Sequence, residues 1–453
     1  MVELNDVYIV DYVRTPFSRS RPRQPERDAY SELRADQLCG LTLRALFAPE
    51  KDEPGYHRSQ VAEKVKMSEV DEFLLGCSLQ VHDNFLYGGR LAWFMGGGPP
   101  EVPCSGYDRQ CGSGMTGLHH GVMQIMTGMA DVIVTSGMEH MTRVSMDPQI
   151  NNHFNPPVPE LAIAPTETTP NPWYRGDIDI MTGFSMIQTA QKLFEEESDW
   201  CTKQMMDEWG LRAHKQAQAA YDAGFTQGEL VPVDAHKEGA VDKPETIKKD
   251  LAIRGNTSLE QIARLPPVSQ PGYRGGYKNP RFKSREYNEK FGTRKGLITA
   301  GNSSPLNAGA ATLVLMSERA MKDRGLEPIA KILSIGWGAV DPSVMGRGPV
   351  PASEMALKHA GLKVEDVDYW EINEAFCIVA LNCIHALGIP EPEQRVNFPG
   401  GSTAIGHPLG ATGNRLVGTV ARTLRWKKKK YGLANLCCGG GQGVAVVVEN
   451  PDA

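Results

Sequence analysis

Short runs of β-branched and aliphatic residues alternate with amphipathic helical patterns along most of the chain. Strand-like runs are found at residues 8–13 (YIVDYV), 131–137 (DVIVTSG), 312–317 (TLVLMS) and 444–448 (VAVVV). This alternation is typical of an α/β fold, in which helices pack against the faces of a sheet. With 453 residues, the chain is long enough for about three domains.

The sequence changes character between about residues 145 and 285. Pro-rich stretches occupy 151–160 and 167–173, and a charged, Gly-rich segment occupies 273–290. Between them, Met205 to Ala223 has a helical pattern. We expect this region to be an inserted loop domain carried on a compact core. The predicted organisation is an N-terminal half (1–144), a loop domain (145–285) and a C-terminal half (286–453).

The two halves share a faint internal repeat of glycine turn, helix, strand and second glycine turn. In the first half, QCGSGMTG leads into a helix and then into the strand DVIVTSG; in the second, GHPLGATGN leads into a helix and then into ANLCCGGG. A duplicated α/β unit would place the two turns near each other around a pseudo-twofold axis. The apolar positions of the two helices are Met115, Leu118, Val122, Ile125 and Met129 in the first and Leu416, Val417, Val420 and Leu424 in the second.

Composition excludes several classes of protein. The chain has 48 Lys and Arg against 54 Asp and Glu. The resulting net charge of −6 provides no positive electrostatic field that would attract nucleic acid or an anionic membrane. The nine cysteines are scattered and odd in number, which argues against a disulfide framework and for a reducing compartment. The N-terminus has no signal-peptide pattern, and the apolar stretch 377–389 is too short to span a bilayer. We expect a cytoplasmic protein without a membrane span.

Cys111 lies at the predicted start of the first repeat helix, between Arg109 and the glycines at 112 and 114. Unsatisfied backbone N–H groups and the positive end of the helix dipole favour a thiolate there. A thiol in this position could be a nucleophile. A small residue also suits the packing of a helix on a sheet, and the local sequence leaves both interpretations open.

Cys437 and Cys438 precede three glycines, Gly439 to Gly441, which lead into a strand. A nucleotide-binding loop would lead into a helix, so this segment is a poor phosphate cradle. The glycines could present backbone N–H groups to a reacting carbonyl, as an oxyanion hole requires. The alternative is a β-bulge or a tight turn.

Three more polar residues stand in apolar surroundings. His407, within GHPLGATG, could be catalytic or a hydrogen-bonded structural residue. Asn373 and Glu374 open a segment that is apolar on nearly every side, where they either cap a buried helix or serve a site, and capping alone would satisfy them. The spacing of Cys and His does not match a zinc site, so we expect no metal.

Four segments, in this order, resemble the signature blocks of the thiolase family: QCGSG, EINEAF, GHPLGATG and CCGGGQG, at 110–114, 371–376, 406–413 and 437–443. The likeness covers nearly the whole chain and is thinnest in the central region. It implies the thiolase fold, an α/β fold with a duplicated five-layered α/β/α/β/α core and an inserted loop domain over the active site.

The same resemblance assigns six site residues by their motif positions. They are Cys111 as the acylated nucleophile, His407 as its base, Cys437 as a second acid/base, Asn373 as the holder of an oxyanion-binding water, Gly439 as an N–H donor of a second oxyanion hole together with Cys111, and Ser304 facing the pantetheine arm of coenzyme A. The chain departs from the family pattern at Gly112, where a small Ser or Ala is usual, at Cys438, where an aliphatic residue is usual, and at Asn307, near which an acid is frequent.

The activity implied by the resemblance is cleavage of a 3-ketoacyl-CoA by coenzyme A, or the reverse Claisen condensation, through an acyl-cysteine intermediate, as in fatty acid β-oxidation. The expected partners are acyl-CoA and coenzyme A, with no metal, nucleotide or flavin cofactor, and the expected assembly is a homodimer or homotetramer. Two rival functions are a condensing enzyme of the ketoacyl-synthase type and a noncatalytic acyl-CoA or lipid carrier on the same scaffold.

Overall fold

The computed structural model describes residues 4–49, 53–146, 180–183, 185–268 and 296–453. The Pro-rich stretches, the charged segment at 273–290 and the predicted boundary at 285 lie outside these residues, and the boundary at 144 stays a prediction. The helix expected from Met205 to Ala223 is confirmed as α7 (Lys203–Asp222), whose first turn is capped by the Thr202 hydroxyl accepting the Met205 N–H at 3.2 Å.

A mixed sheet forms the framework, and its strands follow one another in the order β10-β11-β12-β9-β1-β8-β5-β3-β4, with β2 paired to β8. The four predicted strand runs are confirmed as β1, β5, β8 and β12. The strands are β1 (Val7–Arg14), β2 (Ser18–Arg19), β3 (Glu72–Gly76), β4 (Cys104–Tyr107), β5 (Val132–His140), β8 (Asn307–Ser317), β9 (Ala330–Ala339), β10 (Tyr369–Ile372), β11 (Tyr431–Cys438) and β12 (Gln442–Glu449), while β6 (Val233–Lys237) and β7 (Ala240–Ile247) form a separate hairpin.

The two ends of the sheet repeat one pairing pattern. β3 runs parallel to β5, β5 is antiparallel to β8, and β8 is antiparallel to β1. In the same way β10 runs parallel to β11, β11 is antiparallel to β12, and β12 is antiparallel to β9. A short antiparallel contact between β1 and β9 joins the two ends. This repetition confirms the duplication expected from the sequence.

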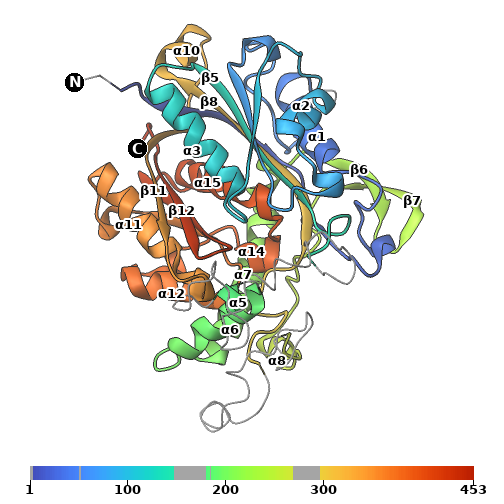
Figure 1. Ribbon diagram of the computed structural model, residues 1–453, viewed down its shortest axis with the longest axis vertical. Coiled ribbons are helices and arrows are strands. Elements are labelled where there is room, and N and C mark those ends of the chain that lie inside the picture. Colours follow the sequence, from blue (N-terminus) through green and yellow to red (C-terminus); the bar gives the residue numbers. More distant parts are fainter. Residues whose placement is uncertain (1–3, 50–52, 147–179, 184, 269–295) are drawn as a thin grey trace, which may run out of the picture.

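Helices lie outside and between the two halves of the sheet (Figure 1). α1 contacts β5 and β8 on one outer face, α11 contacts β9, β11 and β12 on the other, and α3 and α15 contact strands of both halves. The order helix, sheet, helix, sheet, helix is the expected five-layered core. The helices are α1 (Ala35–Phe47), α2 (Arg90–Met95), α3 (Ser113–Met126), α5 (Ile180–Gly183), α6 (Met186–Glu196), α8 (Leu259–Ala263), α10 (Glu318–Asp323), α11 (Pro349–Ala360), α12 (Cys377–Leu387), α13 (Pro392–Arg395), α14 (Ser402–Ile405) and α15 (Leu409–Lys427).

α3 and α15 form the central layer because their apolar faces are buried on both sides. Every predicted apolar position of the two helices is buried except Met129, which is 81% exposed. The assignment of Met129 to the helix was wrong, because α3 ends at Met126 and Gly128 turns the chain with a φ of +74°. Burial of each such aliphatic side chain contributes roughly 1.5–3 kcal/mol.

Glycines let the first turns of α3 and α15 approach the strands. A Cβ at Gly114 of α3, or at Gly137 of β5, would overlap the carbonyl oxygen of Gly410 in α15. Only a residue without a side chain fits between backbones at this distance. The segments that contain Cys111 and His407 therefore meet at the centre of the molecule.

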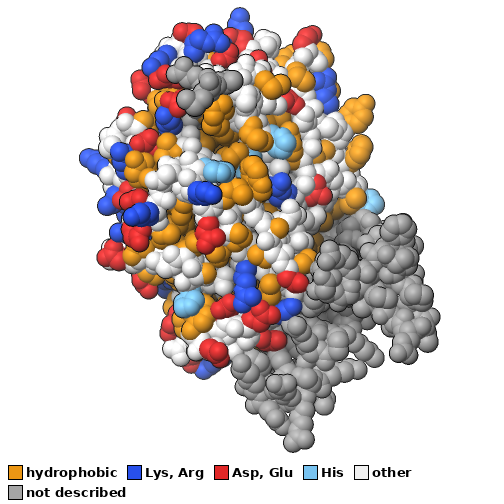
Figure 2. Space-filling view, turned by 60° about the vertical axis from the view of Figure 1, so that its left-hand side comes forward, with side chains coloured by type: hydrophobic (Ala, Val, Ile, Leu, Met, Phe, Trp, Pro, Cys, Tyr) orange, Lys and Arg blue, Asp and Glu red, His pale blue; other side chains and the backbone are white. Residues whose placement is uncertain are grey.

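The surface carries charges of both signs, and Figure 2 shows them interspersed over the face it presents. None of the helices in the described part of the chain combines the length and the apolar character needed to cross a membrane. All nine cysteines are free thiols, which confirms that the chain has no disulfide framework.

Candidate active site

Cys111 lies in the turn before α3, and the preceding Gln110 has a left-handed φ of +49°. The thiol is buried, and burial raises its pKa to about 12, although backbone N–H groups of Gly439 and of Cys111 itself act in the opposite direction. The helix start alone favours a thiolate, but here desolvation is the larger effect. Cys111 is therefore a neutral thiol at pH 7 in the free protein.

The segment after Cys438 is a tight turn that also faces the thiol of Cys111. β11 and β12 pair as far as Cys438 with Gln442, and the intervening Gly440 and Gly441 have φ values of +80° and +81°. Glycine is favoured at both positions because other residues rarely adopt this conformation. Gly439 presents its N–H to the sulfur of Cys111. The tight turn and the oxyanion hole, which the sequence left as alternatives for this segment, are thus compatible, since the turn directs a backbone donor toward the thiol.

Cys437 and Cys438 point to opposite faces of β11, as successive residues of a strand do. Both are fully buried, Cys438 in the apolar cluster that contains Cys111 and Cys437 in the cluster formed with α12. A Cβ at Gly112 would overlap the sulfur of Cys438, so this thiol occupies the space that the glycine leaves. Burial is the main cause of the raised pKa of Cys437, and the neighbouring Cys111 adds to it.

His407 lies two residues before the first residue of α15, and its backbone N–H and both ring nitrogens have polar partners. Its backbone N–H donates to Asn307 Oδ1 at 2.9 Å, its Nδ1 lies 2.7 Å from Thr412 Oγ1, and its Nε2 lies 3.3 Å from Asn373 Nδ2. Burial, and next the positive charge of Arg415, lower the pKa of His407 to about 3. The imidazole is therefore neutral at pH 7.

Asn373 and Glu374 do not cap the buried helix α12, so the capping interpretation was wrong, although Glu374 Oε2 accepts the Thr403 N–H in the first turn of α14 at 3.2 Å. α12 begins four residues after Asn373, at Cys377, and the Cys377 N–H donates to the carbonyl oxygen of Asn302. Glu374 is a structural acceptor, which receives hydrogen bonds from Trp209 Nε1 at 2.8 Å and from Asn397 Nδ2 at 2.7 Å.

Asn373 faces the site instead, because its amide contacts His407 and Ser402. Ser304 contacts the same stretch of chain, where its backbone N–H and its hydroxyl each donate to the carbonyl oxygen of Ala375 at 3.1 Å. Ser304 is therefore bonded to Ala375, which follows Asn373 by two residues.

Glu139 of β5 bonds the start of α15 to the segment after β3 and lies near enough to Cys111 to affect its pKa. Its carboxylate accepts the Gly410 N–H at 3.1 Å and the Ser78 N–H at 2.9 Å, and its charge is one of the causes that raise the pKa of Cys111. Burial raises the pKa of Glu139 itself to about 7. The structure thus brings Cys111, Cys437 and Gly439 together and places His407 and Asn373 in contact, with Ser304 bonded to the segment that follows Asn373.

Sequence reasoning missed the residues that orient His407 and Asn373. Asn307 was noted only as a departure from the family pattern, Glu371 and Thr412 lie inside signature blocks but were given no role, and Ser402 and Arg415 were not singled out. The one available signal was a polar residue inside an apolar helix pattern, such as Arg415 in α15, which is fully buried.

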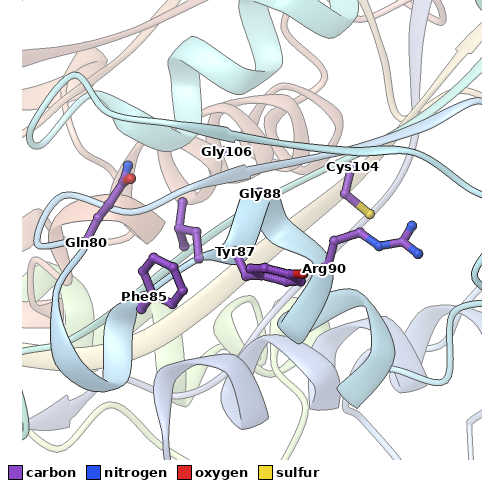
Figure 3. A pocket seen from close by; sticks show the side chains of 8 residues that line it. Gln80, Phe85, Tyr87, Gly88, Arg90, Cys104 and Gly106 are labelled. Carbon is purple, nitrogen blue, oxygen red and sulfur yellow. The ribbon is translucent and has the colours of Figure 1, made fainter.

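A cavity of about 710 Å³ lies beside β4, the edge strand of the sheet (Figure 3). Phe85 and Tyr87 line it and are 56% and 65% exposed, and Arg90 and Cys104 lie on the side of Tyr87 that is away from Phe85. None of the six predicted site residues lines this cavity. Over the ranges that the structure covers, His, Cys, Asp and Glu side chains form no group of three that could hold a metal ion.

Comparison with known proteins identifies the family. The thiolase N-terminal domain matches residues 7–275 and the thiolase C-terminal domain matches residues 326–450. The chain is 33% identical over 445 residues to a 3-ketoacyl-CoA thiolase of Saccharophagus degradans, with 98% of each chain covered, and 32% identical over 447 residues to one of Klebsiella pneumoniae, with 98% of this chain and 100% of the relative covered.

Two solved structures are also similar along almost the whole chain. The human mitochondrial 3-ketoacyl-CoA thiolase has a TM-score of 0.76 at 27% identity, with 99% of this chain and 100% of that chain covered. The Bacillus anthracis acetyl-CoA acetyltransferase has a TM-score of 0.75 at 29% identity, with 99% of each covered. With its duplicated five-layered core and full-length similarity, the chain belongs to the thiolase family of acyltransferases.

Proposed function

We propose that this enzyme cleaves a 3-ketoacyl-CoA with coenzyme A into acetyl-CoA and a shortened acyl-CoA, or runs the reverse Claisen condensation, through an acyl group on Cys111. One observation carries the proposal. The Gly439 N–H lowers the pKa of Cys111, Cys111 raises the pKa of Cys437, and a Cβ at Gly439 would lie 3.1 Å from Gln110 Cγ beside Cys111, so the proposed nucleophile, oxyanion donor and second thiol come together in one buried region. The printed names of the relatives support the same substrate class.

In the proposed first step, His407 accepts the proton of Cys111 and the thiolate attacks the 3-keto carbon. The oxyanion on the attacked carbon is stabilised by the N–H groups of Gly439 and Cys111, and the enolate oxygen of the leaving acetyl-CoA by a water held on Asn373 and His407; each such donor is worth about 10² to 10³ in rate. The C2–C3 bond then breaks, its electron pair stays on C2, and the thiol of Cys437 protonates that carbon. The products of this step are acetyl-CoA and acylated Cys111.

In the second step, the thiol of coenzyme A attacks the acyl group on Cys111 and transfers its proton to Cys437, which was left as a thiolate. The N–H groups of Gly439 and Cys111 would stabilise the oxyanion that forms on the same carbon again. The departing Cys111 sulfur regains a proton from the His407 imidazolium. Cys111, His407 and Cys437 thereby return to their starting protonation states, and the reverse direction uses the same groups.

The resting charge state suits this sequence. With a pKa of about 12 for Cys111 and about 3 for His407, the pair is uncharged at pH 7, and the thiolate forms only when a bound thioester supplies an electrophile. A neutral thiol is a poor target for oxidants and alkylating agents, so burial protects the nucleophile between turnovers.

Neither rival function is favoured. Ketoacyl-synthase-type enzymes pair the cysteine with two histidines, whereas here Asn373 contacts the one histidine of the site. A noncatalytic carrier would not need a donor aimed at a buried thiol. We further propose a cytoplasmic enzyme without a metal or organic cofactor, in line with nine free thiols. The open edge of β4 and the exposed Phe85 and Tyr87 beside it support association with a second copy.

A thiolysis assay tests the proposed function. The enolate absorbance of 3-ketoacyl-CoA substrates from four to sixteen carbons is followed after addition of coenzyme A, with straight and branched chains in parallel. We expect turnover with at least one chain length, and the preferred length identifies the substrate. Absence of turnover with every chain, in protein that still binds acyl-CoA, would instead support the carrier.

A further inference from the structure

The side of His407 that faces α15 determines where its proton lies. His407 Nδ1 is 2.7 Å from the hydroxyl oxygen of Thr412, and that hydroxyl lies 2.8 Å from the carbonyl oxygen of Pro408. A carbonyl can only accept, so the single hydroxyl proton of Thr412 points to Pro408. The Thr412 oxygen must then accept from Nδ1, and His407 carries its proton on Nδ1.

The opposite side of His407 leads to the same assignment independently. Arg415, which can only donate, donates from Nη2 to Ser402 Oγ at 2.7 Å, and Ser402 Oγ lies 2.7 Å from Asn373 Oδ1. Ser402 therefore donates to the amide oxygen, and the amide nitrogen of Asn373 is turned toward His407 Nε2. Nε2 then has to be the nitrogen with the lone pair.

Burial disfavours any other direction of the hydrogen bonds around His407 and Asn373. Ser402, Thr412, Arg415 and Asn373 are all fully buried. If the Asn373 amide flipped, the Ser402 proton would have no acceptor among the residues that the structure describes, and an unsatisfied buried hydroxyl costs about 1–3 kcal/mol. Glu371 at the end of β10 fixes Arg415 through an ion pair at 2.9 Å.

We propose that Ser402 and Thr412 are positioning residues that hold His407 in the Nδ1–H tautomer, which leaves the lone pair on Nε2, the nitrogen that takes the proton of Cys111. The proposal rests on the base role given to His407 in the proposed function. The charged groups around the imidazole are Arg415 from α15, its partner Glu371 from β10, and Glu139 from β5, which bonds to the backbone at Gly410. Removal of the Thr412 hydroxyl leaves the contacts of these groups intact, whereas removal of the Ser402 hydroxyl takes one acceptor from Arg415 and leaves its ion pair with Glu371.

Paired substitutions test the assignment. Thr412→Val keeps the shape and removes the acceptor, whereas Thr412→Ser keeps the hydroxyl. Thr423→Val is the matched control, because Thr423 lies in the same helix, is fully buried, and has a hydroxyl without a partner in the described part of the chain. Ser402→Ala tests the hydrogen bonds on the Nε2 side of His407, where Ser402 donates to Asn373. Activity is measured as kcat and KM for thiolysis, with the melting temperature recorded for every variant.

We expect Thr412→Val and Ser402→Ala to lower kcat by roughly 10- to 100-fold with KM within about threefold, because only the proton transfer is impaired. Thr412→Ser and Thr423→Val should retain most of the activity. In Ser402→Ala the freed amide can turn its oxygen to Nε2 and stabilise imidazolium, so the acid limb of the kcat/KM profile should move to higher pH. A loss of folding alone would not move this limb.

A direct spectroscopic measurement separates this proposal from the proposed function. ¹⁵N NMR of histidine-labelled protein, with the His407 signals identified by their absence in His407→Asn, should show a protonated Nδ1 and an unprotonated Nε2 in the wild type. In Thr412→Val the proton should shift toward Nε2. An Nε2–H tautomer in the wild type, or unchanged kcat in Thr412→Val, would overturn the proposal. The expected tautomer in a protein without thiolysis would leave the assignment intact and defeat the proposed function.

Discussion

The turns before α3 and α15 occupy equivalent places in the duplicated core, yet they hold their key residues differently. Cys111 is contacted by backbone N–H groups and packed by the neighbouring thiol of Cys438 through the gap at Gly112. His407 is bound by side chains on its backbone and on both ring nitrogens. One turn thus positions its residue by shape and the other by hydrogen bonds.

This difference follows from the chemistry that each turn must serve. A nucleophile that becomes acylated has to exchange partners during turnover, so strong side-chain bonds to its sulfur would oppose the reaction. A base has to present one nitrogen in one tautomer, and hydrogen bonds specify that better than packing does. Burial acts on both residues in the same sense, because it disfavours the thiolate and the imidazolium alike.

The largest expected effect comes from removing the nucleophile. Cys111→Ala should lower thiolysis by about 10⁴-fold or more and abolish the acyl-enzyme. Cys437 and Cys438 are the nearby thiols, and burial raises the pKa of both. Mass spectrometry after exposure to acetyl-CoA measures the adduct. Acetyl retained on either remaining cysteine of the site would show that the turn before α3 does not hold the nucleophile.

Removing the second thiol should separate the two chemical roles. Cys437→Ala should still be acylated at Cys111 but should fail to exchange the C2 protons of acetyl-CoA, because no other group is assigned to that carbon. Deuterium incorporation from heavy water measures the exchange, and Cys383→Ala, which removes another buried thiol, is the control. Exchange at the wild-type rate would mean that another base serves this position.

Positioning by shape can be tested with a double-mutant cycle. In Gly112→Ala the new methyl would overlap the sulfur of Cys438 and lie 3.1 Å from Val444 Cγ2, so we expect kcat to fall by roughly 10- to 100-fold through displacement of Cys111. Cys438→Ala combined with it restores the space and should recover most of the loss.

Gly117→Ala is the matched control for this cycle, since it adds a methyl to the same helix with its nearest contact at an ordinary 3.4 Å. Its activity should stay close to that of the wild type. A double variant no better than Gly112→Ala alone would contradict the idea that Cys438 and Gly112 fit each other.

The smallest effect at neutral pH concerns stability. His119, in α3, has a pKa that burial lowers to about 3, well below the usual 6.5. Between pH 6.5 and 3 the unfolded chain binds a proton that the folded chain does not, so the free energy of unfolding decreases as the pH falls. His119→Gln, which keeps a donor for the Ala445 carbonyl, should remove about 2 kcal/mol of this decrease at pH 5.

Urea unfolding at pH 7 and pH 5 measures the difference. The raised pKa of Glu139 acts in the opposite direction over the same range, but it is common to both proteins and cancels in the comparison. Equal pH dependence in the wild type and His119→Gln would show that His119 is protonated in the folded protein.

Much of the framework could be predicted because it depends on local patterns. The β-branched runs became β1, β5, β8 and β12, and the apolar stripes of the two repeat helices became the central layer. Met129 was misplaced because a glycine turn ended the helix within an unbroken apolar pattern. Asn373 and Glu374 were misjudged as caps because their partners, His407 and Trp209, are far away in the sequence.

The amino-acid sequence by itself determined which residue types stand at the turns, the order of the four motifs and the helix and strand periods, since these depend on neighbours along the chain. Tertiary structure alone decided the charge of Cys111 and His407 and the direction of the amide of Asn373. Desolvation and hydrogen-bond direction depend on groups from Asn307, Ser402, Thr412 and Gly439, and only folding brings these into contact.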